Sequence, residues 1–167
     1  MLDDDKTPIA EFENLKVVFE TKDGTVTGVE DVSFCIYPGE TVCVVGESGS
    51  GKSVSSLSMM RLVEFGGGKI KGGKLNFQKQ VGGKIDLVNA TQRAMRRTRG
   101  NEIGMIFQEP MTALNPVFTI GKQLTEGLRL HKNLSKHQAK LRAIELLDQV
   151  RIPEPKNRLN QYPHELS

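Results

Sequence analysis

The chain has 167 residues, of which 37% are hydrophobic and 26% are charged. That length suits one domain with a core, because such a chain removes roughly two-thirds of its unfolded surface from water, so disorder of the whole chain is not expected. Its 23 basic and 20 acidic residues leave a net charge of +3, which is too even to indicate nucleic-acid or membrane-surface binding by bulk electrostatics.

The N-terminal sequence MLDDDKTP is acidic and lacks the basic and apolar regions of a secretory signal, so export is not expected. No stretch approaches the ~20 apolar residues of a membrane span. Cys35 and Cys43 lie in apolar, strand-like runs, where we expect small buried side chains and no disulfide. These features favour a reducing cytosol.

The first predicted elements are two antiparallel strands at 14–20 and 29–37, because apolar residues alternate in both. The sequence TKDG between them supplies a turn. A Pro-Gly pair then breaks the chain before 40–45 (ETVCVV), a β-branched run that is typical of a strand buried in the middle of a sheet.

A glycine-rich loop follows that run, and a helix is expected after the loop at 53–65. The loop sequence GESGSGKS at 46–53 matches the pattern G-x-x-x-x-G-K-[ST] in full. A flexible connector is the alternative interpretation, but it would need neither the strand before the loop nor the helix after it. The motif therefore predicts a nucleoside triphosphate site that takes ATP with Mg²⁺.

Each residue type in this loop has a role in phosphate binding. The glycines let backbone N–H groups form a nest around phosphate oxygens, and the N-terminus of the following helix adds positive partial charge. Lys52 brings a cation to the β- and γ-phosphates, and the Ser53 hydroxyl is expected to ligate Mg²⁺. The predicted nucleotide-binding residues are Gly46, Glu47, Ser48, Gly49, Ser50, Gly51, Lys52 and Ser53.

Beyond the helix, glycine pairs separate KLNF and KIDLV, which predicts a small hairpin over 69–90. Residues 91–99 (TQRAMRRTR) predict a short basic helix, whose arginines we expect to form a solvated face. The run EIGMIF at 102–107 predicts a second core strand, and Gln108 follows it directly.

Gln108 is the second candidate site residue. It would lie at the C-terminal edge of a strand, where ligands of open α/β sheets bind. Its amide could contact Mg²⁺ or orient the attacking water, so Gln108 is predicted as a catalytic residue together with Lys52 and as a metal contact together with Ser53. A loop glutamine in solvent is the alternative interpretation.

Two helices are expected after the turn-rich sequence QEPMTALNP, at 120–131 and 135–150. The second begins with a capping box, in which Ser135 precedes Gln138 by three residues. One apolar face of this helix is predicted to be buried. Its members are Ala139, Ala143, Leu146, Leu147 and Val150.

The sequences GESGSGKS, MIFQEPMTALNPVFTIGKQL and YPHELS occur in this order. In order and spacing they resemble the ATP-binding subunits of ABC transporters. The stretches QEPMTALNP and LLDQVRIPEP resemble more narrowly the dipeptide, oligopeptide and nickel importer group, with the glutathione importer ATPases most similar. The resemblance implies an α/β fold, in which a P-loop NTPase core carries an N-terminal antiparallel β subdomain and part of a helical subdomain.

The resemblance also implies roles and boundaries. It implies a partial ABC ATPase domain over 1–167, with the β subdomain and P-loop core at 1–108 and the Q-loop and part of the helical subdomain at 109–167. Gln108 would be the Q-loop glutamine. Phe19 would stack on adenine, although an apolar strand residue lies more often in the core.

The closing sequence LS would open the signature motif of this family, so the Walker B aspartate and the catalytic glutamate are expected after residue 167. A fragment that ends here is expected to bind ATP and to hydrolyse it poorly. The complete protein would couple ATP binding and hydrolysis to the uptake of peptides.

The partners implied by the resemblance are membrane-spanning permease subunits, a second ATPase module and, indirectly, a substrate-binding protein, with no nucleic acid. The location implied is the cytoplasmic face of the inner membrane. Two other classes stay open. A P-loop kinase for small molecules or nucleotides shares the loop, and a DNA-repair type of ABC ATPase would insert long coiled coil, of which 109–167 shows no sustained heptads.

Overall fold

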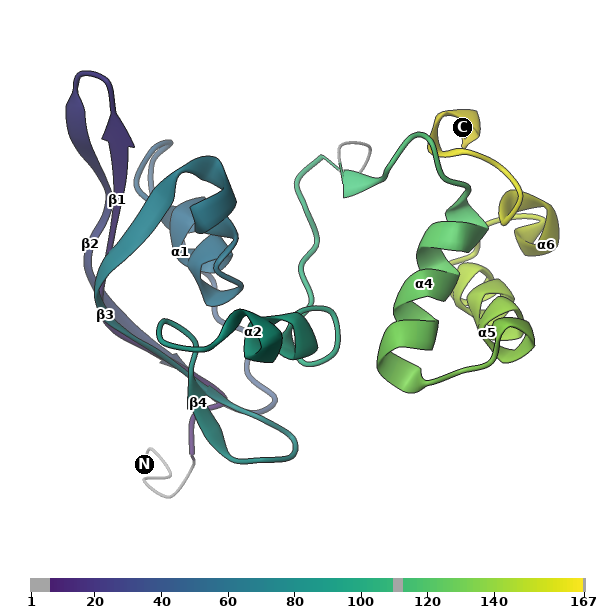
Figure 1. Cartoon of the computed structure of the whole chain (residues 1–167), viewed down its shortest axis with the longest axis horizontal. Helices are drawn as coiled ribbons and strands as arrows, with labels where there is room; N and C mark the ends of the chain where they lie inside the picture. Colours follow the sequence, from purple (N-terminus) through teal and green to yellow (C-terminus); the bar gives the residue numbers. More distant parts are fainter. Residues whose placement is uncertain (1–6, 110–112, 167) are drawn as a thin grey trace. The chain divides into compact units, whose positions relative to one another are not determined.

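The computed structural model describes residues 7–109 and 113–166. The chain divides into two compact units, Met1–Ile103 and Gly104–Ser167 (Figure 1). Ser167 of the predicted signature motif and residues 110–112 of the sequence QEPMTALNP lie outside the described residues.

The first unit is built on a four-stranded antiparallel sheet with the strand order β2-β1-β3-β4. β1 (Ala10–Thr21) and β2 (Gly24–Ile36) form the hairpin that their alternating apolar residues predict. β3 (Gly68–Gln78) pairs with the other edge of β1, and β4 (Lys84–Asp86) pairs with the end of β3. The predicted hairpin over 69–90 is thereby confirmed.

Three short helical segments accompany this sheet: α1 (Lys52–Met59), the 3-10 helix η1 (Leu62–Gly66) and α2 (Gln92–Thr98). The predicted helix over 53–65 is thus divided in two. The core of the unit joins sheet residues to side chains from the helical segments and from the turn before α2. Its most deeply buried members are Leu15, Val17, Leu75, Leu87 and Met95.

Neither of the two predicted core strands forms. Residues 40–45 have no strand conformation, and Val45 is 88% exposed; in 102–107 only Ile103 makes a β-bridge, and Ile106 is 98% exposed. A central strand needs hydrogen-bonding neighbours on both sides. The described residues provide no strands on both sides of either run, so several of the apolar side chains, Val45 and Ile106 above all, stay in water.

Two smaller predictions in this unit are also wrong. Cys43 is exposed, because the run that contains it forms no strand, while Cys35 is half-buried on β2. Arg99, predicted to be solvated, is half-buried and donates from Nε to the Met60 carbonyl oxygen at 2.6 Å. Burial lowers the pKa of Arg99, and the charge of Arg61 lowers it further.

The second unit contains α4 (Ile120–Lys132), α5 (Lys136–Gln149), α6 (Pro155–Arg158) and the 3-10 helix η2 (Pro163–Glu165). Both long helices agree with the predicted ranges to within one residue at each end. No helix in 7–109 or 113–166 is long and apolar enough to cross a membrane.

Local capping and a small core define this unit. The predicted capping box of α5 is confirmed, because Gln138 N donates to Ser135 Oγ at 3.2 Å and Ser135 N donates to Gln138 Oε1 at 3.0 Å. The buried core residues are Ala143, Leu147 and Leu159. Val150, predicted to be buried, is 68% exposed, since it follows the last helical residue.

One carboxylate on the sheet links stability to pH. Glu11 Oε2 accepts from Lys84 Nζ at 2.7 Å and from Asn76 Nδ2 at 3.0 Å, and these bonds hold the pKa of Glu11 below its ordinary value of 4.5. A lowered carboxyl pKa stabilises the folded state above the unfolded pKa, and this stabilisation is lost as the pH falls through the folded pKa.

We therefore expect Glu11→Gln to flatten the acid side of the stability profile. The free energy of unfolding of the variant, measured by urea denaturation at a series of pH values, should lose less than that of the wild type below about pH 4.5. The difference should not exceed ~1 kcal/mol, because the pair lies at the surface. Lys84→Gln should flatten the same region; an unchanged acid slope in both variants would contradict the assignment.

Candidate functional site

The glycine-rich loop begins at Gly46 and runs directly into α1. A turn closes it, with Ser50 N donating to the Glu47 carbonyl oxygen at 3.2 Å. Its first five residues are all exposed: Gly46, Glu47, Ser48, Gly49 and Ser50. The helix side of the motif is therefore present as predicted, and the strand side is not.

The end of the loop packs against the sheet at Gly51. This residue is buried and has a φ of 88°, a backbone angle that residues with a side chain rarely adopt. A Cβ at this position would meet the carbonyl oxygen of Gly28 at 2.5 Å and Val29 Cγ2 at 3.1 Å. Only glycine fits here, so the contact with β2 anchors the start of α1.

Lys52 points back into the loop. Its Nζ donates to the carbonyl oxygen of Gly46 at 2.7 Å, to that of Glu47 at 2.5 Å and to Ser50 Oγ at 3.3 Å. The loop therefore surrounds a cation with oxygens on its concave side. Because these bonds are exposed to solvent, phosphate oxygens can replace some of them at little cost.

The N-terminus of α1 has no partner of opposite charge within its own sequence. No side chain caps it, and its first turn contains no acidic residue. The first N–H groups of a helix lack intrahelical acceptors and carry positive partial charge. Lys52 lies at this end of the helix, so the loop and the helix present positive charge together, which suits a phosphate group.

Ser53 occupies the first turn of α1 with an exposed side chain. Its hydroxyl is a hard oxygen ligand of the kind that Mg²⁺ takes. In the described part of the chain, no group of three or more His, Cys, Asp or Glu could hold a metal ion. The Ser53 hydroxyl fits Mg²⁺ that is bound through this oxygen and the phosphate oxygens of a nucleotide.

Phe19 lies on β1, half-buried at the edge of the sheet core. Its ring covers two glycines, since a Cβ at Gly28 would meet Phe19 Cε2 at 2.6 Å and one at Gly68 would meet Cε1 at 2.9 Å. Gly28 also faces Val54 of α1 and contacts Gly51. The structure therefore brings Phe19 and the end of the glycine-rich loop into contact with the same residue.

Gln108 is exposed and belongs to the second unit, whereas Lys52 belongs to the first. The strand that was predicted to carry Gln108 to the edge of the sheet does not form. Its position beside a γ-phosphate stays a prediction.

Sequence reasoning missed Gly28, which contacts both Phe19 and Gly51. A signal was present, because an isolated glycine inside a strand pattern often marks the close approach of another backbone. The partner of that approach is remote in sequence, so the signal alone names no site.

The family model described as ABC transporter matches residues 29–167. The chain belongs to the ABC transporter family. A solved structure of the ATP-binding cassette MJ0796, a dimer in a post-hydrolysis state bound to ADP and Pi, is similar with a TM-score of 0.77 at 22% identity. That match covers 95% of this chain and 63% of the cassette. The predicted fold class, an ABC ATPase with an antiparallel β subdomain and part of the helical subdomain, is confirmed.

Two similar bacterial proteins are import ATP-binding proteins by name. The chain is 51% identical over 162 residues to a putative peptide import ATP-binding protein of Brucella abortus strain 2308, covering 97% of this chain and 48% of the relative. It is 48% identical over 159 residues to the glutathione import ATP-binding protein GsiA of Pectobacterium atrosepticum, covering 95% and 26%. The chain thus spans about half the length of the first relative and a quarter of the second.

The packing of Gly51 gives a structural prediction with a matched control. Gly39 also has a positive φ of 75°, but a Cβ there would meet nothing within 4 Å. Gly39→Ala should therefore cost only the ~1–2 kcal/mol of the left-handed conformation. Gly51→Ala should cost roughly 1–3 kcal/mol more, because it also overlaps the Gly28 carbonyl. Urea unfolding measures both, and equal losses would show that the loop is not held against β2.

Proposed function

We propose that this chain is the ATP-binding component of an ABC importer that takes up peptides, and that its glycine-rich loop holds the triphosphate of ATP. One observation supports this most strongly. The Lys52 ammonium lies beside the uncapped N-terminus of α1, so positive charge from both gathers at the loop, which suits phosphate. The relatives support peptides as the class of transported substrate, because they are named as peptide and glutathione import ATP-binding proteins.

Within this proposal the loop residues 46–53 bind the nucleotide. Backbone N–H groups of the loop and of the first turn of α1 bind phosphate oxygens, and Lys52 neutralises charge on the β- and γ-phosphates. Ser53 ligates Mg²⁺, which would supply a further positive charge between these phosphates. Phe19 contacts the base, and Gln108 responds to the γ-phosphate as the Q-loop residue.

The partners in the proposal follow from the relatives' names and from the dimeric cassette. An import ATP-binding protein works with permease subunits in the membrane, and we place this chain on their cytoplasmic face. A second ATPase module would complete the dimer, and a substrate-binding protein would act indirectly. Closure of two modules on ATP and their opening after hydrolysis would shift the permease between two states.

The proposal assigns different roles to the parts of the chain before and after the predicted boundary near Gln108. Residues 1–108 would carry the β subdomain and the phosphate loop, and 109–167 would carry the Q-loop and helices that face the permease. After the glycine-rich loop, the 167-residue sequence has no apolar, strand-like run that is followed directly by two acidic residues. We propose that such a polypeptide binds ATP and hydrolyses it poorly.

The loop is tested by the binding of ATP with Mg²⁺ to the 167-residue chain. Lys52→Ala should weaken binding by at least tenfold, because it removes a charged hydrogen-bond donor worth ~1.5–3 kcal/mol. Lys74→Ala, which removes a lysine paired with Glu13 on the sheet, should leave the affinity unchanged. Calorimetric titration measures all three proteins.

Equal affinities of the wild type and Lys52→Ala for ATP would contradict the proposed nucleotide site. Phosphate release, followed in the same samples, should not exceed that of Lys52→Ala. Release well above that level would show that these 167 residues suffice for hydrolysis, and it would overturn the second part of the proposal.

The role of Phe19 is tested by comparing two ligands. Phe19→Leu should weaken ATP binding by several-fold, since stacking of an aromatic ring is worth ~0.5–1.5 kcal/mol. It should leave the affinity for tripolyphosphate, which has no base, unchanged. A parallel loss for both ligands would indicate that Phe19 acts through the packing of Gly28 and the loop, and would assign it to the core.

A further inference from the structure

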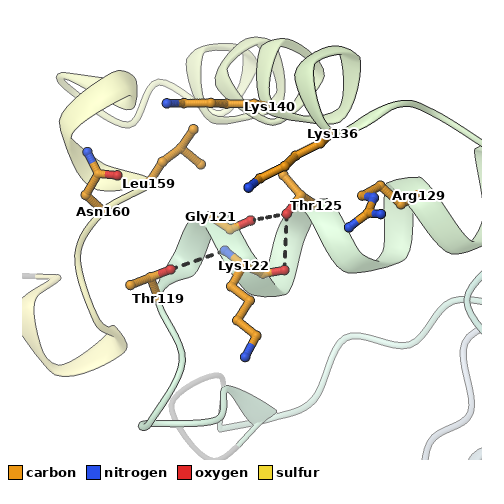
Figure 2. Close-up of a pocket in the computed structure, with 9 residues that line it drawn as sticks. All are labelled: Thr119, Gly121, Lys122, Thr125, Arg129, Lys136, Lys140, Leu159 and Asn160. Atoms are coloured by element: carbon orange, nitrogen blue, oxygen red, sulfur yellow. Dashed lines mark hydrogen bonds between the residues drawn. The ribbon is translucent and has the colours of Figure 1, made fainter.

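A cavity of about 310 Å³ lies in the second unit, between α4, α5 and the segment that follows α6 (Figure 2). Four cationic residues line it, and no acidic residue is among the described residues that do so. The cations are Lys122, Arg129, Lys136 and Lys140, and the other lining residues are Thr119, Gly121, Thr125, Leu159 and Asn160. These nine residues are called the basic pocket below.

Backbone bonds and a core residue hold the walls of the basic pocket in place. Gly121 N donates to the Leu159 carbonyl oxygen at 2.8 Å, and Ile120 N donates to that of Gln161 at 2.8 Å. Leu159 is 3% exposed and packs in the core that Ala143 and Leu147 of α5 share with side chains of α4. The pocket is therefore a consequence of how this unit packs, and its shape does not depend on exposed side chains alone.

The cations of the basic pocket differ from the lysines of the sheet. Five sheet lysines lie 2.5–3.7 Å from glutamate carboxylates: Lys16, Lys69, Lys71, Lys74 and Lys84. Within 113–166, by contrast, no ion pair involves a cation of the pocket, and Lys122 lies over the Phe118 ring at 3.4 Å. Glu126 lines a neighbouring hollow beside Lys122 and Arg129 but forms no salt bridge with either.

Unpaired like charges in a concave site raise the local positive potential and attract anions. In Figure 2, Lys136 extends from α5 toward Thr125 of α4, whereas Lys122 points away from it. Thr125 Oγ already donates to the Gly121 carbonyl oxygen at 2.6 Å, so its proton is engaged. The donors for an anion are thus Lys136, Lys140 and Arg129, with the Asn160 amide on the opposite wall.

We propose that the basic pocket is a second phosphate site, separate from the phosphate loop, and that it takes a ligand with a diphosphate or a similarly charged phosphate group. A guanidinium binds phosphate with two parallel hydrogen bonds, and ammonium groups add point charges. The volume is at the lower end of the ~300–1,000 Å³ of small-ligand sites, which suits a charged head group. A free phosphate ester and an anionic lipid head group share this chemistry.

The test uses the 167-residue chain with Lys52→Ala, so that the phosphate loop does not contribute. Pyrophosphate is titrated at low salt into this protein and into the same protein with Lys136→Gln and Lys140→Gln. The added pair should weaken binding by at least tenfold, which is about 1.4 kcal/mol. The matched control is Lys74→Gln with Lys84→Gln, which removes the same charge from the sheet and should change the affinity less than twofold.

Vesicles distinguish the two sources of phosphate. Phosphatidylcholine vesicles with and without phosphatidic acid are sedimented with the same proteins. Binding to the acidic vesicles that Lys136→Gln with Lys140→Gln abolishes would assign the site to a lipid head group, whereas binding of pyrophosphate alone would assign it to a soluble ligand. Binding of neither probe, or equal losses in the two lysine pairs, would overturn the proposal.

Two further measurements keep the test valid if the double variant fails to fold. Glutamine favours helices, so α5 should persist in the double variant, and far-ultraviolet circular dichroism checks it. Independently, pyrophosphate should shift the backbone amide resonances of Thr125 and Asn160 in the Lys52→Ala chain, and should leave those of Lys74 and Lys84 in place. Absence of these shifts would overturn the proposal, and this result would not depend on a substitution in the pocket.

Discussion

The contact between Gly51 and Gly28 is the constraint on which the proposed nucleotide site depends. It brings the end of the glycine-rich loop against β2, with no side chain between the two backbones. The first turn of α1 starts from this contact, and the Lys52 side chain turns back from there to the loop oxygens. The ring of Phe19 also lies against Gly28. Two glycines remote in sequence therefore decide where the proposed phosphate end and the proposed base end of the site can be.

The loop keeps its conformation although the run before it forms no strand. Residues 40–45 have no strand conformation and are mostly exposed, yet the turn at Glu47 and the bonds of Lys52 to its own loop are present. This is understandable, because the turn and the bonds of the Lys52 ammonium to loop carbonyl oxygens join residues that are close in sequence and require few remote partners. The loop is thus a self-contained structure whose attachment to the sheet comes from its C-terminal end.

The two units differ in how their charged side chains are distributed. The sheet of the first unit pairs its lysines with glutamates on other strands, such as Lys84 with Glu11 and Lys69 with Glu20. The helical unit gathers Arg129, Lys136 and Lys140 at one cavity without such partners among its described residues. A net charge of +3 conceals this difference. Charge balance over a whole chain therefore says little about the local potential at a concave site.

The sequence by itself determined the features that depend on neighbouring residues. The hairpin of β1 and β2 follows from alternation and a turn, and the start of α5 from Ser135 and Gln138; the motif at 46–53 likewise predicts the loop that runs into α1. Only the tertiary structure decided which apolar runs are buried. The runs at 40–45 and 102–107 have the composition of central strands, but strand pairing depends on remote partners that local composition does not contain. The role of Gly28 and the basic pocket arise in the same way, since each exists only where segments distant in the chain meet.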